Sequence, residues 1–168
     1  IAPGPGYLAI EIAKRKKCKL FALEISETFV EIARTNAQHA GVEIDIRRGN
    51  ASDMPFERGM FDFILCSSSF KNFSEPVRAL QEIHRVLKAG GKAWISDLRR
   101  DVSDKTIRDF VANEMKVKGL AAAFMRYAFK HTLRPRAYSA EQFKEMASMI
   151  PIRRIEVRNN PMDFVALL

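Results

Sequence analysis

The sequence has no long hydrophobic run and very little cysteine. No apolar stretch reaches the ~18 residues of a membrane-spanning helix, which excludes a transmembrane protein. Cys18 and Cys66 stand 48 residues apart with no second cysteine near either. This supports neither a disulfide framework nor a cysteine-based zinc site. The scarce cysteines indicate a reducing cytoplasm, and we expect no metal. No basic-then-apolar leader precedes the expected domain, so the sequence offers no secretion signal.

The composition is that of a globular domain with an uneven charge. The 168 residues, 47% hydrophobic and 29% charged, suit one domain. The formal net charge is +8, and from Arg99 to Arg136 ten basic residues accompany only four acidic ones. The positive charge is therefore concentrated in one segment.

Helical and extended patterns alternate along the chain. Helices are expected over residues 6–17, 26–41, 74–91, 102–134 and 139–149, and strands over 19–25, 42–48, 61–66, 92–98, 152–158 and 162–168. This alternation predicts an α/β fold, Rossmann-like and doubly wound, around a mostly parallel sheet. The continuous apolar run at 61–66 predicts a strand buried on both faces. A short turn at 159–161 makes the last two strands a hairpin, so the last strand is antiparallel.

A glycine-rich turn precedes the first expected helix. Gly4, Gly6 and Ala9 form a G-x-G-x-x-A pattern, whose glycines let backbone approach a ligand at a helix start. Glu24 follows Gly6 by 18 residues, at the end of the next strand, where a carboxylate can accept both hydroxyls of a ribose. On these residues alone, a nicotinamide dinucleotide and another nucleoside cofactor both remain open.

Three further motifs follow in a fixed order. They are Gly49–Phe56 (GNASDMPF), Phe61–Leu65 (FDFIL) and Glu82–Lys92 (EIHRVLKAGGK). With the glycine turn, they resemble class I S-adenosylmethionine-dependent methyltransferases, in the branch that includes ubiquinone/menaquinone-biosynthesis C-methyltransferases. The resemblance covers about residues 2–100. It implies methyl transfer from S-adenosylmethionine to a small-molecule acceptor.

The resemblance also implies which residues contact the cofactor. The glycine turn would lie against the methionine part, Glu24 on the ribose and Asn50 by the adenine, with Asp53 as an alternative to Asn50 or a turn cap. Ser67, at a strand end, would lie near the sulfonium. The implied cofactor residues are Ala2, Gly4, Pro5, Gly6, Glu24, Ile25, Asn50, Ala51, Asp53 and Ser67.

The sequence departs from the family pattern in two places. Ala2 stands where members usually have a glycine, and the acidic residue before it would precede residue 1. Residues 1–168 are therefore expected to form a single methyltransferase domain that lacks its N-terminal first strand. After the fourth strand of the pattern, residues 70–73 replace a pair of histidines, so no substrate-activating histidine is expected there.

The expected catalytic demands are modest because the sulfonium is already activated, and alignment supplies much of the rate. A base is needed only where the acceptor must lose a proton, and the candidates are His131, Tyr127 and Asp97. We expect residues 99–136 to form a helical lid over a lipophilic or anionic acceptor. The candidate acceptor contacts are Phe70, Lys71, Met125 and Tyr127.

Other interpretations remain open at this point. The lid segment also fits an ordinary amphipathic helix pair or contact with an anionic membrane surface. Nucleic acid is disfavoured as a partner because the sequence carries no RNA-binding module. The alternative functions are a non-catalytic protein that binds S-adenosylmethionine or S-adenosylhomocysteine, and an RNA methyltransferase.

Overall fold

The computed structural model describes residues 1–152 and 154–168. The helices are α1 (Tyr7–Arg15), α2 (Glu27–His39), α3 (Pro76–Val86), α4 (Asp104–Asn113), α5 (Gly119–Ala128) and α6 (Ala140–Ser148). The strands are β1 (Phe21–Glu24), β2 (Asp45–Arg48), β3 (Phe61–Ser67), β4 (Leu87–Leu98), β5 (Glu156–Asn159) and β6 (Asp163–Leu167). Residue 153, which the sequence places in a strand, lies outside the described residues. The expected α/β alternation is confirmed.

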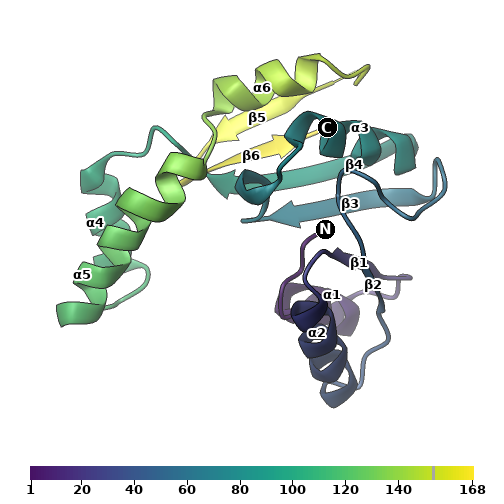
Figure 1. Cartoon of the computed structure of the whole chain (residues 1–168), viewed down its shortest axis with the longest axis horizontal. Helices are drawn as coiled ribbons and strands as arrows, with labels where there is room; N and C mark the ends of the chain where they lie inside the picture. Colours follow the sequence, from purple (N-terminus) through teal and green to yellow (C-terminus); the bar gives the residue numbers. More distant parts are fainter. Residues whose placement is uncertain (153) are drawn as a thin grey trace.

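The strands form two sheets rather than the single sheet expected. β1 and β2 pair in parallel, and the larger sheet has the order β3-β4-β6-β5. In Figure 1, α1 and α2 accompany the small sheet, while α3 and α6 lie along one face of the large one. β3 and β4 are parallel, whereas β6 is antiparallel to both β4 and β5. The predicted antiparallel last strand and closing hairpin are confirmed.

The first two residues connect the two sheets. The amino group of Ile1 donates to the Leu65 carbonyl oxygen of β3 at 2.7 Å, and the Ala2 amide donates to the Leu23 carbonyl oxygen of β1 at 2.8 Å. Three rings also pack edge to face between the sheets, with centroids 4.9 to 6.0 Å apart. They belong to Phe21, Phe56 and Phe61. The carboxyl ends of β1 and β3 are thereby brought side by side.

The main hydrophobic core lies between the large sheet and helices α3 and α6. Ile95 pairs with Cys66 on one side and Ala166 on the other, and all three are fully buried. Phe143 of α6 and Phe164 of β6 close this core, with ring centroids 5.0 Å apart. α6 begins with the predicted capping box, in which Ser139 and Gln142 bond each other's backbone amides.

The prediction that the 61–66 strand is buried on both faces is wrong. Ile64 and Cys66 are buried, but Phe63, which points to the other face, is 52% exposed. The reason is the placement of the helices: α3 and α6 share one face of the large sheet, while α1 and α2 pack on β1–β2.

Residues 99–136, the predicted lid, begin at the carboxyl end of β4, the end at which an open α/β sheet receives ligands. α4 and α5 pack through buried Ile107, Val111 and Ala122, and Leu98 and Val102 join this cluster to the sheet. The helix predicted over 102–134 is divided at residues 114–118, and α5 is followed by a π-helical turn (Phe129–Leu133) and a 3₁₀ turn (Arg134–Arg136). In the described ranges, no helix is long and apolar enough to cross a bilayer.

Candidate active site

The glycine turn wraps the start of α1 and is fastened to α2. Gly4 and Gly6 have φ values of +54° and +85°, which favour glycine. A Cβ on Gly6 would lie 3.1 Å from the Cβ of Ala33, whereas one on Gly4 would meet nothing within 4 Å. The side-chain amide nitrogen of Asn36 (Nδ2) donates to the Pro5 carbonyl oxygen at 2.9 Å. The turn is therefore fixed from α2 and open beside Gly4; Asn36 carries no local sequence signal of this role.

Glu24 holds a buried carboxylate against the turn. Its side chain is at the end of β1, and the residue is only 5% exposed. Oε2 accepts the Gly4 amide at 3.1 Å, and Oε1 accepts the Ser26 amide at 3.0 Å. Each carboxylate oxygen accepts more than one hydrogen bond, so capacity remains for two ligand hydroxyls. The turn, the open space beside it and this carboxylate fit a nucleoside cofactor.

The residues expected by the adenine lie beside Glu24. The Gly49 amide donates to the Glu24 carbonyl oxygen at 2.9 Å, which sets the next turn against the end of β1. Within that turn, the side-chain oxygen of Asn50 accepts the Ser52 amide at 3.0 Å. Ala51 is buried and Asp53 is exposed. Asn50 therefore shapes its own turn, and only its remaining hydrogen-bonding capacity is available to a ligand. On the other side of Glu24, Ile25 is 64% exposed and offers an apolar surface.

The end of β3 meets the glycine turn through Ser69, and the role predicted for Ser67 near the sulfonium stays a prediction. Ser67 accepts the Ser96 hydroxyl at 3.2 Å. The Ser69 hydroxyl instead reaches the turn, 3.3 Å from the Ala2 carbonyl oxygen. Ala2 adopts φ +50°, a conformation that costs an L side chain energy and that glycine adopts freely. The resemblance placed a glycine at this position, and the backbone shows why.

Asp97 and Lys71 form a buried ion pair between the end of β4 and the turn after β3. One Asp97 oxygen lies 2.8 Å from the Lys71 ammonium and also accepts the Leu98 amide, while the other accepts the Lys71 amide at 2.7 Å. The Lys71 side chain is 8% exposed and the Asp97 side chain 1%. The Lys71 ammonium also donates to the Ser68 carbonyl oxygen. The carboxylate predicted as a base and the cation predicted for an anionic acceptor thus neutralise each other.

Phe70 does not fit the role of an acceptor contact. It is fully buried, and its ring packs against Phe73, Tyr138 and Phe143. It anchors the turn after β3 to the main core, which explains why an apolar residue stands there. The expectation that Phe70 touches the acceptor is therefore corrected.

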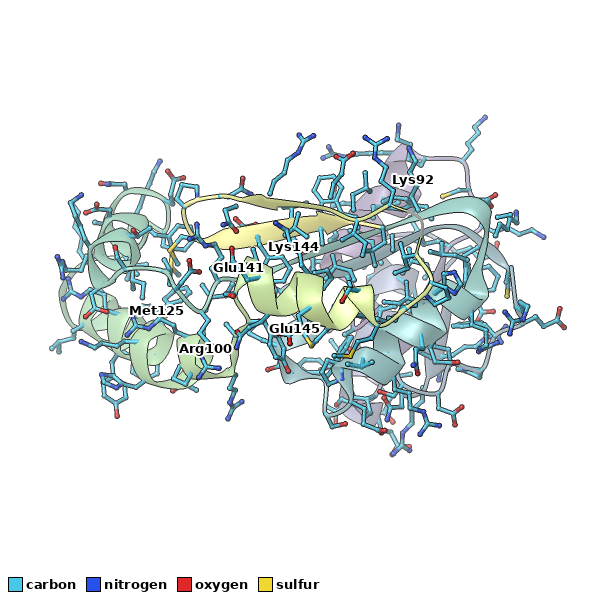
Figure 2. All side chains as sticks on the ribbon, turned by 90° about the horizontal axis from the view of Figure 1, so that it is seen from above. Lys92, Arg100, Met125, Glu141, Lys144 and Glu145 are labelled. Carbon is cyan, nitrogen blue, oxygen red and sulfur yellow. The ribbon has the colours of Figure 1, made fainter. Side chains whose placement is uncertain are left out.

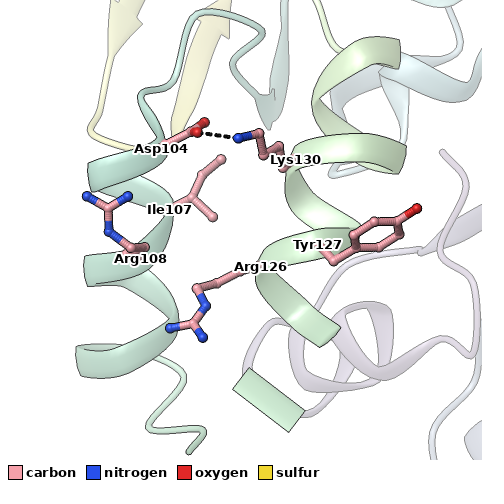
Figure 3. A pocket seen from close by; sticks show the side chains of 6 residues that line it. All are labelled: Asp104, Ile107, Arg108, Arg126, Tyr127 and Lys130. Carbon is pink, nitrogen blue, oxygen red and sulfur yellow. Dashed lines mark hydrogen bonds and ion pairs between the residues drawn. The ribbon is translucent and has the colours of Figure 1, made fainter. Parts of the chain in front are cut away.

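The remaining candidates lie on the lid. Tyr127 is 63% exposed and its ring lies 4.7 Å from that of exposed His131, centroid to centroid. Met125 packs against the α4–α5 cluster. A cavity of about 190 Å³ is lined by residues of α4, α5 and Lys130. Figure 3 shows the ion pair between Asp104 and Lys130, whose charged atoms lie 2.6 Å apart. The catalytic roles of Tyr127 and His131 stay predictions. The described residues contain no cluster of metal-binding side chains.

A family model described as "Methyltransferase domain" matches residues 1–95. This is more than half of the 168 residues, so the chain belongs to the methyltransferase-domain family. That membership assigns S-adenosylmethionine as the cofactor, as the resemblance implied.

Curated relatives agree with this assignment. A demethylmenaquinone methyltransferase of Chlorobaculum tepidum is 29% identical over 156 residues, covering 90% of this chain and 61% of the relative. The demethylmenaquinone methyltransferase of Thermus thermophilus is 31% identical over 93 residues, and the match covers 55% of this chain and 42% of the relative. The ubiquinone/menaquinone biosynthesis C-methyltransferase UbiE of Wigglesworthia glossinidia brevipalpis is 30% identical, with coverages of 60% and 42%. The chain thus spans about half the length of these relatives.

Solved structures show the same fold. One is described as a putative S-adenosyl-L-methionine-dependent methyltransferase from Methanococcus maripaludis, and it matches with a TM-score of 0.75 at 24% sequence identity. The match covers 99% of this chain and 74% of the Methanococcus chain. A SAM-dependent methyltransferase from Aquifex aeolicus has a TM-score of 0.72 at 19% identity, with coverages of 99% and 77%. The predicted Rossmann-like fold class is confirmed.

Proposed function

We propose that this chain forms the cofactor core and acceptor lid of an S-adenosylmethionine-dependent methyltransferase that acts on a lipophilic small molecule. The observation that carries the proposal is the contact between Glu24 and Gly4, which joins a buried carboxylate to an open glycine turn. When bound, the cofactor supplies a methyl group already activated for transfer.

The chain's own residues would bind and orient the reactants. Glu24 holds ribose hydroxyls, and the turn around Gly4 lets the ligand approach the backbone. The Lys71–Asp97 pair fixes the turn after β3, so that the acceptor meets a defined surface. Because Asp97 is already engaged by three donors, any proton removal falls to Tyr127 or His131 on the lid.

The exposed face of α5 favours a lipophilic acceptor over an anionic one. Leu120, Phe124 and Tyr127 follow helical spacing and are 90%, 68% and 63% exposed. Two lid cations, Lys130 and Arg134, share the single carboxylate of Asp104, which offsets one of their two charges. The menaquinone and ubiquinone named in the relatives' descriptions are lipophilic ring compounds, which supports the same acceptor class.

Calorimetry with S-adenosylhomocysteine tests the cofactor site. Glu24→Gln should weaken binding about tenfold or more, because a hydrogen bond to a charged group contributes roughly 1.5–3 kcal/mol. Glu31→Gln is the matched control, since Glu31 lies exposed on α2, and it should bind like the parent. Equal affinity of the Glu24→Gln variant and the parent would refute the ribose role.

Turnover tests the acceptor class. S-adenosylhomocysteine release should be faster with a short-chain demethylmenaquinol than with a polar phenol or amine, and Phe124→Asp should raise KM for the quinol without changing cofactor affinity. A preference for the polar acceptors would contradict the lipophilic assignment.

A second candidate function is cofactor binding without methyl transfer. The pairing of Asp97 with the Lys71 ammonium favours it, because the other predicted bases, Tyr127 and His131, lie outside the strands of the sheet. The fold is compatible with other chemistry: the structure titled as the [4+2]-cyclase SpnF matches with a TM-score of 0.69 at 23% identity. Cofactor binding with no release of S-adenosylhomocysteine from any acceptor would select this function.

A further inference from the structure

A second cavity lies at the opposite end of the large sheet from the glycine turn. Its volume is about 750 Å³, and it is bounded by the end of α3, the start of β4, the segment between α6 and β5, and the end of β6. The candidate active site is instead at the carboxyl ends of β3 and β4, marked by Ser67 and Asp97. The described residues that line this cavity include none of those predicted for cofactor, acceptor or catalysis.

An irregularity in the sheet builds one wall of the cavity. Phe61 pairs with Leu87 and Phe63 pairs with Lys92, so β4 advances by five residues while β3 advances by two. The surplus residues bulge from the ladder, as extra residues in a strand do. A Cβ on Gly91 would lie only 3.0 Å from the Phe61 carbonyl oxygen. This wall is therefore closely packed backbone, which limits its ability to collapse into the cavity.

The floor of the cavity is apolar and continuous with the main core. Leu87, Ile152 and Leu168 are partly buried and pack against the core cluster, and fully buried Ile83 lies behind them. A ligand with an apolar body would remove this surface from water, which is favourable. The volume falls within the ~300–1,000 Å³ typical of small-molecule pockets.

The rim is basic and only partly neutralised. Five lysine and arginine side chains line the cavity, and three of them have carboxylate partners. These pairs are Arg85 with Glu82, Lys88 with Asp62, and Arg154 with Glu156. Across residues 1–152 and 154–168, Arg58 and Lys92 make no ion pair. Figure 2 places Lys92 at the far end of the molecule from Met125 of the lid.

We propose that this cavity binds an amphiphilic anion. The ligand has an apolar body that covers Leu87 and Ile152, and one carboxylate, sulfonate or phosphate group that meets Arg58 and Lys92. An uncharged apolar molecule would leave the two cations without a partner, and a bare inorganic anion would leave the floor in water. Both parts of the ligand are therefore needed for tight binding.

Titration with decanoate, followed by amide NMR in the absence of cofactor, tests the proposal. Decanoate should shift the amide signals of Gly59, Gly90 and Gly91 saturably. Decanol, which has the body without the charge, should bind more weakly, and inorganic phosphate should not shift these signals. Shifts confined to α5, or equal binding of decanol, would overturn the proposal.

Charge variants separate this cavity from general attraction to a basic protein. Arg58→Gln and Lys92→Gln should each weaken decanoate binding about two- to fivefold, and the double variant about tenfold, as expected for partly exposed ion pairs. Lys118→Gln, at the start of α5, is the matched control and should bind like the parent. Parent-like affinity of the double variant would contradict the proposal, and unshifted amides elsewhere would show that the variant is folded.

Discussion

The two faces of the four-stranded sheet differ sharply in what covers them. On one face, Cys66, Ile95 and Ala166 pair across three strands and are fully buried beneath α3 and α6. On the other, Trp94 pairs with Leu167 and remains 43% exposed, and Phe63 is 52% exposed. Large apolar side chains stand on both faces, so residue type alone does not decide burial.

This difference shows where the stability of the chain lies. Burial of a side chain contributes in proportion to the apolar area removed from water. The face beneath α3 and α6 therefore stabilises the fold, whereas the open face contributes less for side chains of similar size. Substitutions on the two faces provide a direct measure of the contrast.

Phe164→Ala should produce the largest loss of stability. Phe164 is fully buried between β6 and Phe143, and truncation of a buried phenylalanine costs about 3–5 kcal/mol through lost burial and the cavity left behind. Urea unfolding monitored by circular dichroism measures the change. Phe164→Leu, which keeps most of the volume, should lose clearly less; a loss under about 1 kcal/mol for the alanine variant would contradict the assignment of the core.

Lys71→Met should be nearly as damaging, because it leaves the Asp97 carboxylate buried without its cation. Removal of one partner of a buried ion pair costs about 3–5 kcal/mol. The Lys71→Met, Asp97→Asn double variant removes both charges and should recover part of the loss in a double-mutant cycle of unfolding free energies. Strict additivity of the two single effects would show that the 2.8 Å contact contributes no coupling.

The sequence predicted the order of elements but not the division of the sheet. Helix starts and turns follow local rules, and the capping box at Ser139 is the clearest example. The covered face and the open face are not distinguishable from a continuous apolar run such as Phe61–Cys66, because burial depends on where distant helices pack. At the site, Gly4 and Glu24 were identified by spacing. Asn36 was not, since its contact with Pro5 spans 31 residues and leaves no local pattern.

The alkaline stability of the covered face should depend on Cys66. Burial raises the pKa of the Cys66 thiol from 9.0 to about 11. The folded protein therefore keeps the thiol protonated at a pH where the unfolded chain ionises it, so stability is fully present below pH 9 and falls between about pH 9 and pH 11. The loss approaches about 1.4 kcal/mol per pH unit in that window. Urea unfolding at several pH values measures this loss of stability. Cys66→Ala should abolish the loss between pH 9 and pH 11, whereas Cys18→Ala, at an exposed cysteine, should leave it unchanged.

Trp94→Ala should cause the smallest loss, although it removes the larger side chain. Trp94 lies on the open face, 43% exposed, where truncation creates no enclosed cavity. Its free energy of unfolding should fall by about 1 kcal/mol or less, in line with partly exposed positions, while Phe164→Ala loses several times as much. The same urea titration measures both variants. A loss for Trp94→Ala as large as that for Phe164→Ala would mean that the open face is covered in solution, and the contrast between the two faces would then disappear.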